Sequence, residues 1–236
     1  MKGCGKLYLL PVPISDSALR EYLPEHNIAV INGLDRFIAE DLKAARRFLK
    51  VCGYADISKA EITILNEHTK GNEIETLLKD LVNGENVGLM SDAGCPGIAD
   101  PGAEVVALAH RKGIRVVPLA GPSSIVLSIM ASGFNGQNFA FVGYLPVDRL
   151  QRAKRIRELE TRAAKEKQAQ FFIETPYRNT QMYGDLLTSL SGTTMLFIGS
   201  EITAPGEQLI SRRVEEWKRL PPPPLHKVPA VFGIFK

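Results

Sequence analysis

VGLMSDAGCPGIADPG, residues 87–102, runs from a short apolar segment into a loop rich in glycine, proline and aspartate. We expect a buried strand at Val87–Ser91 and a helix after the loop, with Asp100 as its N-cap and Pro101 as its first residue. Ligands of open α/β sheets bind beyond the carboxyl ends of the strands, so Asp92 is positioned to accept hydrogen bonds from a ligand. An ordinary strand-to-helix turn explains the same pattern equally well.

Short apolar segments alternate with helical patterns along the whole chain, which is typical of α/β architecture. The strands expected in the first half are Lys6–Val12, Ile28–Ile31, Ile62–Leu65, Val87–Ser91 and Arg115–Leu119. Those expected in the second half are Phe139–Leu145, Gln170–Glu174, Thr194–Ile198 and Val228–Phe235. A Gly-Pro break at Gly121-Pro122 predicts two α/β domains, residues 1–120 and 121–236.

Apolar residues at a spacing near 3.6 predict the helices between these strands. The predicted helical segments are Leu34–Leu49, Ile74–Val82, Val105–Ala109, Ser123–Ala131, Leu150–Lys167 and Tyr177–Leu190. The segment Gln208–Trp217 begins like a strand and ends like a helix, so its type stays open.

Two further loops resemble residues 91–97 in following a strand and opening a helix. In Pro118–Ser124, Ser123 suits a helix N-cap, while its hydroxyl and the nearby amides also suit a second part of one ligand. In Phe171–Arg178, Glu174 and Arg178 either pair across the turn or face a cleft. Three such loops favour one cleft that holds a small-molecule cofactor.

Several classes of protein are excluded by the sequence. Cys4, Cys52 and Cys95 are too scattered for a disulfide framework or a zinc site, so we expect no metal and a reducing compartment. Neither a Walker motif nor a GxGxxG motif is present. No apolar run approaches the roughly 20 residues of a membrane span, and the N-terminal run is too short for a secretion signal. We therefore expect a cytoplasmic protein without membrane contact.

Basic residues crowd one predicted helix, although the formal net charge of the chain is only +3. Arg152, Arg155 and Arg162 share a face at three- or four-residue steps. Interspersed glutamates such as Glu158 are equally typical of a solvated, salt-bridged helix. Beside a cofactor cleft, the same face suits contact with RNA phosphates.

The ordered motifs resemble the tetrapyrrole methylase superfamily of S-adenosylmethionine-dependent methyltransferases. Within it, the chain is similar to the branch that 2'-O-methylates a cytidine of small-subunit ribosomal RNA. Residues 88–102 match a run of Ser-Asp-Ala-Gly, a proline and Asp-Pro-Gly in that branch. Gly143-Tyr144-Leu145-Pro146 is similar to its Gly-Phe-Leu-Pro, Phe172–Arg178 to its Phe-Tyr-Glu-Ser-Pro-His-Arg, and Glu201-Ile202-Thr203 to its Glu-Leu-Thr.

The resemblance implies two α/β domains with S-adenosylmethionine in the cleft between them, in a homodimer. It also implies ribosomal RNA, or the small ribosomal subunit, as the partner. The residues that it assigns to the cofactor are Pro13, Ser91, Asp92, Ala93, Gly94, Ser123, Ser124, Leu145, Phe172, Glu174 and Val231. We expect Arg152, Arg155 and Arg178 to contact the substrate.

The chain departs from that branch at its first strand and near its first acidic motif. Val12-Pro13-Ile14-Ser15-Asp16 replaces Thr-Pro-Ile-Gly-Asn, and Leu42-Lys43 follows Ala39-Glu40-Asp41 where the branch has Thr-Arg. Transfer to a ribose hydroxyl requires loss of a proton, to a side chain or to water. Glu40, Asp41 and Glu174 are the candidate bases, and the sequence does not choose among them.

Three functions remain open at this point. The first is an RNA 2'-O-methyltransferase. The second is a methyltransferase acting on a tetrapyrrole or another small molecule, against which the basic helix weighs. The third is a catalytically silent module that only binds the cofactor.

Overall fold

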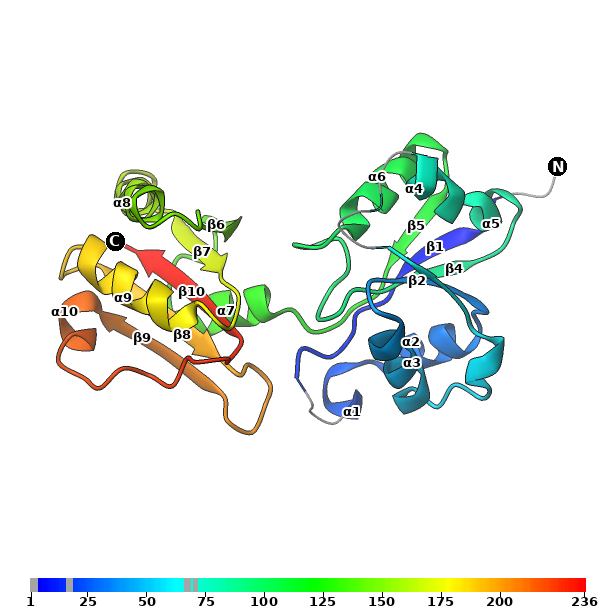
Figure 1. Ribbon diagram of the computed structural model, residues 1–236, viewed down its shortest axis with the longest axis horizontal. Coiled ribbons are helices and arrows are strands. Elements are labelled where there is room, and N and C mark those ends of the chain that lie inside the picture. Colours follow the sequence, from blue (N-terminus) through cyan, green and yellow to red (C-terminus); the bar gives the residue numbers. More distant parts are fainter. Residues whose placement is uncertain (1–3, 16–18, 66–68, 70–71) are drawn as a thin grey trace. The chain divides into compact units, whose positions relative to one another are not determined.

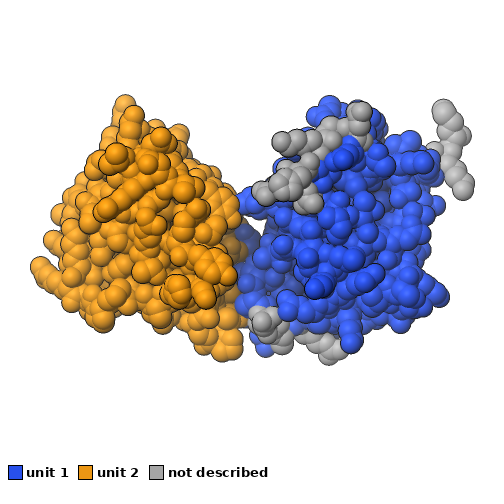
Figure 2. All heavy atoms as spheres, in the orientation of Figure 1, with its two compact units in different colours: residues 1–123 blue, residues 124–236 orange. Residues whose placement is uncertain are grey.

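The computed structural model describes residues 4–15, 19–65, 69 and 72–236, and it divides into two compact units. Unit 1 comprises residues 1–123 and unit 2 residues 124–236 (Figure 2). Asp16, part of the departure noted above, lies outside the described residues. No helix in the described part of the chain is long and apolar enough to cross a membrane.

Unit 1 is built on a parallel sheet of five strands in the order β3-β2-β4-β1-β5 (Figure 1). The strands are β1 Lys6–Leu9, β2 Arg36–Ala39, β3 Glu61–Ile64, β4 Val87–Leu89 and β5 Arg115–Pro118. Because all five run the same way, their carboxyl ends meet at one edge of the sheet. The loops that follow β1, β2 and β4 therefore start side by side.

Helices cover both faces of this sheet, as a parallel sheet requires. The helices are α1 Leu19–Tyr22, α2 Glu25–Asn32, α3 Leu42–Val51, the 3-10 turn η1 Ile57–Lys59, α4 Asn72–Leu77, α5 Lys79–Val82 and α6 Gly102–Arg111. One core cluster joins the strands to α4, α5 and α6, with Leu78 and Leu81 fully buried. A second joins them to α2 and α3 through Ile31, Phe37 and Leu49.

Unit 2 has a mixed sheet in the order β6-β7-β10-β8-β9. Its strands are β6 Phe139–Tyr144, β7 Ala169–Ile173, β8 Met195–Ser200, β9 Gln208–Arg213 and β10 Ala230–Phe235, and its helices are α7 Ser124–Ser132, α8 Arg149–Glu166, α9 Asn179–Ser189 and α10 Val214–Trp217. Only β6 and β7 pair in parallel, and the other pairs are antiparallel. The segment whose type stayed open contains both a strand, β9, and a short helix, α10.

The expected α/β architecture is confirmed, but two elements of unit 1 were predicted wrongly. The segment Ile28–Ile31 is not a strand, because it lies within α2. The predicted helix Leu34–Leu49 contains a strand, β2, which pairs with β3 and β4, followed by α3. Asp41 separates the two elements, since its carboxylate accepts a 2.7 Å hydrogen bond from Ala44 N and thereby starts α3.

The start of α6 lies one residue later than expected. The helix begins at Gly102, and Pro101 occupies the N-cap position. The Asp100 carboxylate nevertheless accepts hydrogen bonds from Gly102 N at 2.7 Å and from Gly97 N at 2.8 Å. It therefore anchors both the helix start and the preceding loop.

Gly121→Ala tests how tightly the loop after β5 packs against the loop after β1. A Cβ at this position would overlap Pro11 Cβ and lie 2.6 Å from its Cγ. Because a proline ring cannot rotate away, we expect a loss of about 1–3 kcal/mol in the free energy of unfolding of unit 1, measured by urea denaturation. Gly33→Ala is the control, since its Cβ would meet Val30 O at an ordinary 3.5 Å. Equal stability of the two variants would contradict this packing.

Candidate functional site

The loops after β1 and β4 are joined by backbone hydrogen bonds at the carboxyl edge of the unit 1 sheet. Val12 N donates to Gly94 O at 2.9 Å, and Gly94 N donates to Val12 O at 3.2 Å. Gly94 has a φ of +76°, a backbone conformation that side chains disfavour. An added Cβ would also lie 3.3 Å from Ile14 Cγ2. Glycine at position 94 thus lets the two loops meet.

The loop after β4 is also fixed from within and against the loop after β5. The Ser91 hydroxyl donates to Ala93 O at 3.2 Å, and the Asp100 carboxylate holds the far end of the loop as described above. The Cys95 thiol donates to Pro122 O at 3.3 Å, and burial raises the pKa of this thiol. Ser123 follows Pro122 directly and so lies at the same edge.

A pocket of about 510 Å³ opens where these loops meet α3. This volume lies within the range of sites that bind small molecules. Its lining comprises Val12, Pro13, Ile14, Ser15, Leu19, Ala39, Asp41, Ala44, Ala45, Arg47, Phe48, Val51, Met90, Ser91, Asp92 and Ala93. Four of the expected cofactor residues, Pro13, Ser91, Asp92 and Ala93, therefore line one cavity.

Carboxylates gather at this edge of the sheet: Asp41 and Asp92 line the pocket, and Glu40 lies between β2 and Asp41. Glu40 Oε1 accepts a 3.2 Å hydrogen bond from Asp92 N, which ties the loop after β2 to the loop after β4. Burial raises the pKa of Glu40, and the nearby Asp100 and Asp92 raise it further. Burial also raises the pKa of Asp92, with a contribution from Asp41. The edge thus carries concentrated negative charge, which suits a cationic ligand.

The remaining expected cofactor residues belong to unit 2, where Ser124 begins α7. Leu145 and Phe172 are buried in the core cluster of that unit, and the Phe172 ring stacks on Phe232 at 5.8 Å. Val231 is buried in β10, where it pairs with Ile173 of β7. These side chains are therefore structural in unit 2, and their contact with a cofactor stays a prediction.

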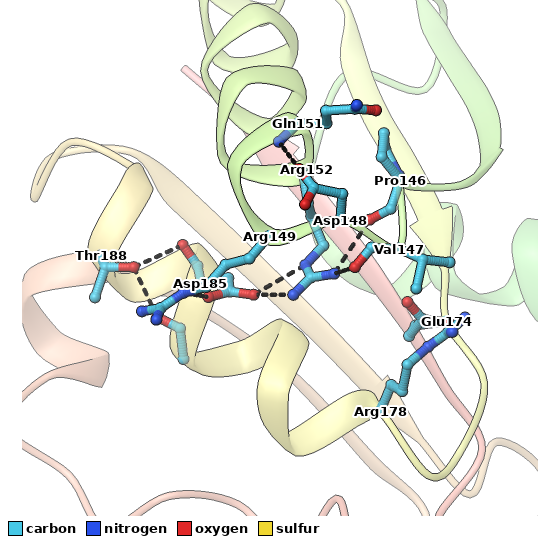
Figure 3. Close-up of polar contacts among 11 residues, drawn as sticks. Pro146, Val147, Asp148, Arg149, Gln151, Arg152, Glu174, Arg178, Asp185 and Thr188 are labelled. Carbon is cyan, nitrogen blue, oxygen red and sulfur yellow. Dashed lines mark hydrogen bonds and ion pairs between the residues drawn. The ribbon is translucent and has the colours of Figure 1, made fainter.

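Glu174 and Arg178 form the ion pair that was one of the two expectations for them. Arg178 Nη2 lies 2.7 Å from Glu174 Oε1, and the Glu174 side chain is 1% exposed (Figure 3). Thr175 N also donates to the same carboxylate oxygen. A carboxylate held by two donors is poorly available as a base. Arg178 is half-buried, and its contact with substrate stays a prediction.

Arg152 does not lie on the solvated face where we expected it to contact RNA. The residue is 1% exposed, and its guanidinium bonds to Asp185 at 2.5 and 2.9 Å and to the carbonyls of Pro146 and Val147 (Figure 3). Substrate contact by Arg152 is therefore corrected to a structural role. The reason is helical spacing, because Arg152 lies on the same buried face of α8 as Ile156 and Leu159.

The exposed face of α8 remains strongly basic without Arg152. Five cations, Lys154, Arg155, Arg157, Arg162 and Lys165, surround a shallow hollow together with two anions, Glu158 and Glu166. Five against two gives this face a local charge of +3. Arg155 pairs with Glu158 at 3.3 Å, so it is accessible but partly neutralised.

Sequence reasoning missed Asp185 and the α3 side of the pocket. Asp185 lies on α9, 33 positions from its partner Arg152, so no local spacing could have linked them. Phe48 and Ala44 were assigned to one long helix, which hid that α3 begins beside the pocket. The N-cap signal of Asp41 could have located that start. In the described residues, no group of three His, Cys, Asp or Glu side chains could hold a metal ion.

The chain matches the family model described as Tetrapyrrole (Corrin/Porphyrin) Methylases over residues 6–218. The chain belongs to the tetrapyrrole methylase family. It is accordingly an S-adenosylmethionine-dependent methyltransferase, the class that its motifs indicated. The match covers unit 1 and most of unit 2, and it ends before β10.

Curated relatives named "Ribosomal RNA small subunit methyltransferase I" resemble this methylase over most of its length. The protein of Halalkalibacterium halodurans is 32% identical over 91% of this chain and 71% of its own. That of Thermotoga maritima is 31% identical over 90% of each chain. That of Mesorhizobium japonicum is 33% identical, and the chain spans 65% of its length.

Solved structures share the fold of this methylase. The methyltransferase CobJ aligns over 98% of this chain and 94% of its own, with a TM-score of 0.66 and 14% identity. Uroporphyrin III C-methyl transferase from Thermus thermophilus aligns over 98% of both chains, with a TM-score of 0.57 and 17% identity. At such identities the likeness concerns the fold alone.

Glu40→Gln tests how the half-buried Glu40 carboxylate contributes to the negative charge at the carboxyl edge of the unit 1 sheet. A carboxyl whose pKa is raised by folding contributes stability that is present below its unfolded pKa of about 4.3 and is lost as pH rises through the folded value. We therefore expect the free energy of unfolding to fall less between pH 4 and pH 7 in Glu40→Gln than in the wild type. The amide retains an oxygen that accepts from Asp92 N.

Glu104→Gln on the exposed side of α6 is the control and should follow the wild-type curve. Denaturant titrations at a series of pH values provide the measurement. If Glu40→Gln and the wild type lose stability in parallel, Glu40 does not carry the unfavourable charge.

Proposed function

We propose that this methylase transfers a methyl group from S-adenosylmethionine to the 2'-hydroxyl of a cytidine in small-subunit ribosomal RNA. The observation that carries the proposal is the set of relatives with RNA-methyltransferase names, which are 31–33% identical over 86–91% of the chain. The motifs quoted from the sequence belong to the same branch. The basic face of α8 adds physical support, because RNA is a polyanion.

The acidic edge of unit 1 fits the charge of the methyl donor. S-adenosylmethionine supplies an activated methyl group on a positively charged sulfonium. Asp92 and Asp41 at the pocket rim would attract that positive charge and the ammonium of the same molecule. Ser91 offers a hydroxyl, and Val12 and Met90 offer apolar surface. Carboxylate, hydroxyl and apolar groups in one pocket suit a ligand with these parts.

The loop geometry would allow the enzyme to act chiefly by positioning its reactants. Displacement at an activated methyl group needs an attacking oxygen in line and little other assistance. The Val12–Gly94 bridge and the Asp100 carboxylate hold the loop after β4 in place. Binding a ligand would therefore cost little conformational entropy in this loop. A rigid loop of this kind holds a donor at fixed orientation.

Glu40 is the carboxylate best suited to receive the proton of the ribose hydroxyl. Burial raises the pKa of Glu40 toward the pH at which the enzyme works, and a base is most effective when its pKa is near that pH. Glu174 is already held by two donors, and Asp41 caps α3. Among the three candidates named from the sequence, Glu40 is therefore our choice, with water as the alternative acceptor.

Two finer assignments rest on the family resemblance. We propose that the protein acts in the cytoplasm, where ribosomes are modified, and that it is a homodimer. The acceptor is the small ribosomal subunit or its RNA, with the α8 face against the phosphates. A tetrapyrrole acceptor is the second candidate, because the matching family model is described as Tetrapyrrole (Corrin/Porphyrin) Methylases.

Asp92→Ala tests the assignment with methyl transfer from labelled S-adenosylmethionine to small subunits that lack the modification. We expect the wild type to label the ribosomal RNA and Asp92→Ala to reduce the rate on the order of a hundredfold, because the donor loses its orientation. Asp35→Ala is the matched control. Asp35 precedes β2 and therefore lies at the opposite, amino edge of the sheet.

Two results would count against the RNA proposal, and a third would count against the place of Asp92 in the site. Labelling of a porphyrinoid with no labelling of RNA would favour the tetrapyrrole acceptor. Tight donor binding by calorimetry with no turnover on any acceptor would make the protein a silent binding module. Equal loss of activity in Asp92→Ala and Asp35→Ala would remove Asp92 from the site.

A further inference from the structure

The segment 143–148, which comprises the end of β6 and the loop that joins it to α8, is held by one buried side chain. Arg152 Nη1 donates to Val147 O at 2.6 Å and to Pro146 O at 3.1 Å. Both carbonyls therefore turn toward the first turn of α8, from which Arg152 projects. Figure 3 shows the guanidinium between this loop and α9.

The other side of the guanidinium is fixed by α9. Arg152 Nε and Nη2 both bond to Asp185 Oδ2, at 2.9 and 2.5 Å. Asp185 is buried as well, and Arg149 Nε lies 3.4 Å from its second oxygen. The planar guanidinium places its donors at fixed angles, which a lysine ammonium does not. The orientation of Asp185 thus determines where the two loop carbonyls lie.

Independent contacts fix both ends of the same loop. Gly143 has a φ of +70°, and Leu145 is buried in the core cluster of unit 2. Asp148 caps α8 by accepting from Gln151 N at 2.9 Å. Because each peptide unit is planar and trans, inward carbonyls of Pro146 and Val147 turn the following N–H groups to the opposite side of the loop. Arg152 therefore sets which backbone groups the loop presents.

We propose that the Arg152–Asp185 pair is a positioning device that holds residues 143–148 in the conformation that receives the methyl donor. The proposal rests on the proposed function, since the resemblance assigns Leu145 of this loop to the donor. Both side chains are buried. Their effect passes through the carbonyls of Pro146 and Val147.

A purely stabilising role can be separated from this positioning role. Replacing both partners of a buried ion pair by apolar residues often leaves stability unchanged. Removing one partner is destabilising, because the other charge stays buried without a counterion. The double variant Arg152→Met with Asp185→Leu keeps the volume and apolar contacts but removes the donors to both carbonyls. We expect it to fold, with an unfolding midpoint near that of the wild type.

Two measurements on the full chain test the proposal. Amide hydrogen exchange without ligand should become about tenfold faster in peptides covering residues 143–150 of the double variant. Calorimetry with S-adenosylmethionine should give a Kd about tenfold weaker, and KM for the donor should rise with kcat nearly unchanged. Arg152→Lys should weaken donor binding by a similar factor. The lysine keeps a positive charge beside Asp185 but cannot donate to both carbonyls.

Val214→Ala is the control for general loss of stability. Val214 is fully buried and follows β9, which lies at the other edge of the sheet from β6. It should lower the unfolding midpoint and leave donor Kd unchanged. Unchanged exchange of residues 143–150 in the double variant would show that the Arg152–Asp185 pair does not hold this segment. Faster exchange with a wild-type Kd, or an equal Kd change in Val214→Ala, would overturn its positioning role.

Failure of the proposed function gives a different result. A wild-type protein that binds the donor but methylates no RNA would refute the RNA acceptor and leave the Kd test intact. A wild type that binds no S-adenosylmethionine would refute both the donor site and the positioning role. The exchange experiment would still show whether the Arg152–Asp185 pair holds residues 143–148.

Discussion

The backbone bridge between Val12 and Gly94 is the constraint on which the site in unit 1 depends. Parallel strands bring the carboxyl ends of β1 and β4 together, but strands alone do not fix the loops beyond them. Two hydrogen bonds join the loops, and the left-handed backbone of Gly94 makes them possible. The pocket, the position of Ser91 and the link from Asp92 N to Glu40 all follow from this junction.

The two units carry opposite charge where each meets a reactant in our account. The carboxyl edge of the unit 1 sheet holds two carboxylates, Glu40 and Asp92, whose pKa values are raised by burial and by neighbouring carboxylates. That energetic cost suits a cationic donor, which would relieve the repulsion on binding. The exposed face of α8 carries five cations and two anions, which suits a polyanionic acceptor. Charge would thus distinguish the two proposed substrates.

Much of the fold was predictable because parallel strands and long helices leave strong local patterns. Residues 149–166 form α8 as their spacing predicted, and β4 leads into the glycine-rich loop. The errors at α2 and β2 arose because short apolar runs fit either period. Pairing of β2 with β3 and β4 decides its type, and that pairing depends on residues about 25 and 50 positions away.

The candidate site, like the fold, has residues that the sequence placed correctly and residues that it did not. The rule for parallel sheets placed Asp92 beyond a strand end, and the family resemblance added Ser91, Ala93 and Pro13, which line the same pocket. Arg152 lies four residues before Ile156 and seven before Leu159, so helical spacing puts it on the buried face, but its charge indicated a solvated position. Its partner Asp185 comes from another helix, so only tertiary packing reveals that the pair supports the loop at residues 143–148.

A crystal structure of the full chain with S-adenosylhomocysteine tests the central claim most directly. The account predicts ligand density against Pro13 and Ser91–Gly94, with its amino-acid end near Asp92 and the Pro146 and Val147 carbonyls still bonded to Arg152. Ligand density elsewhere, with the pocket beside α3 and the loop after β4 untouched, would contradict it.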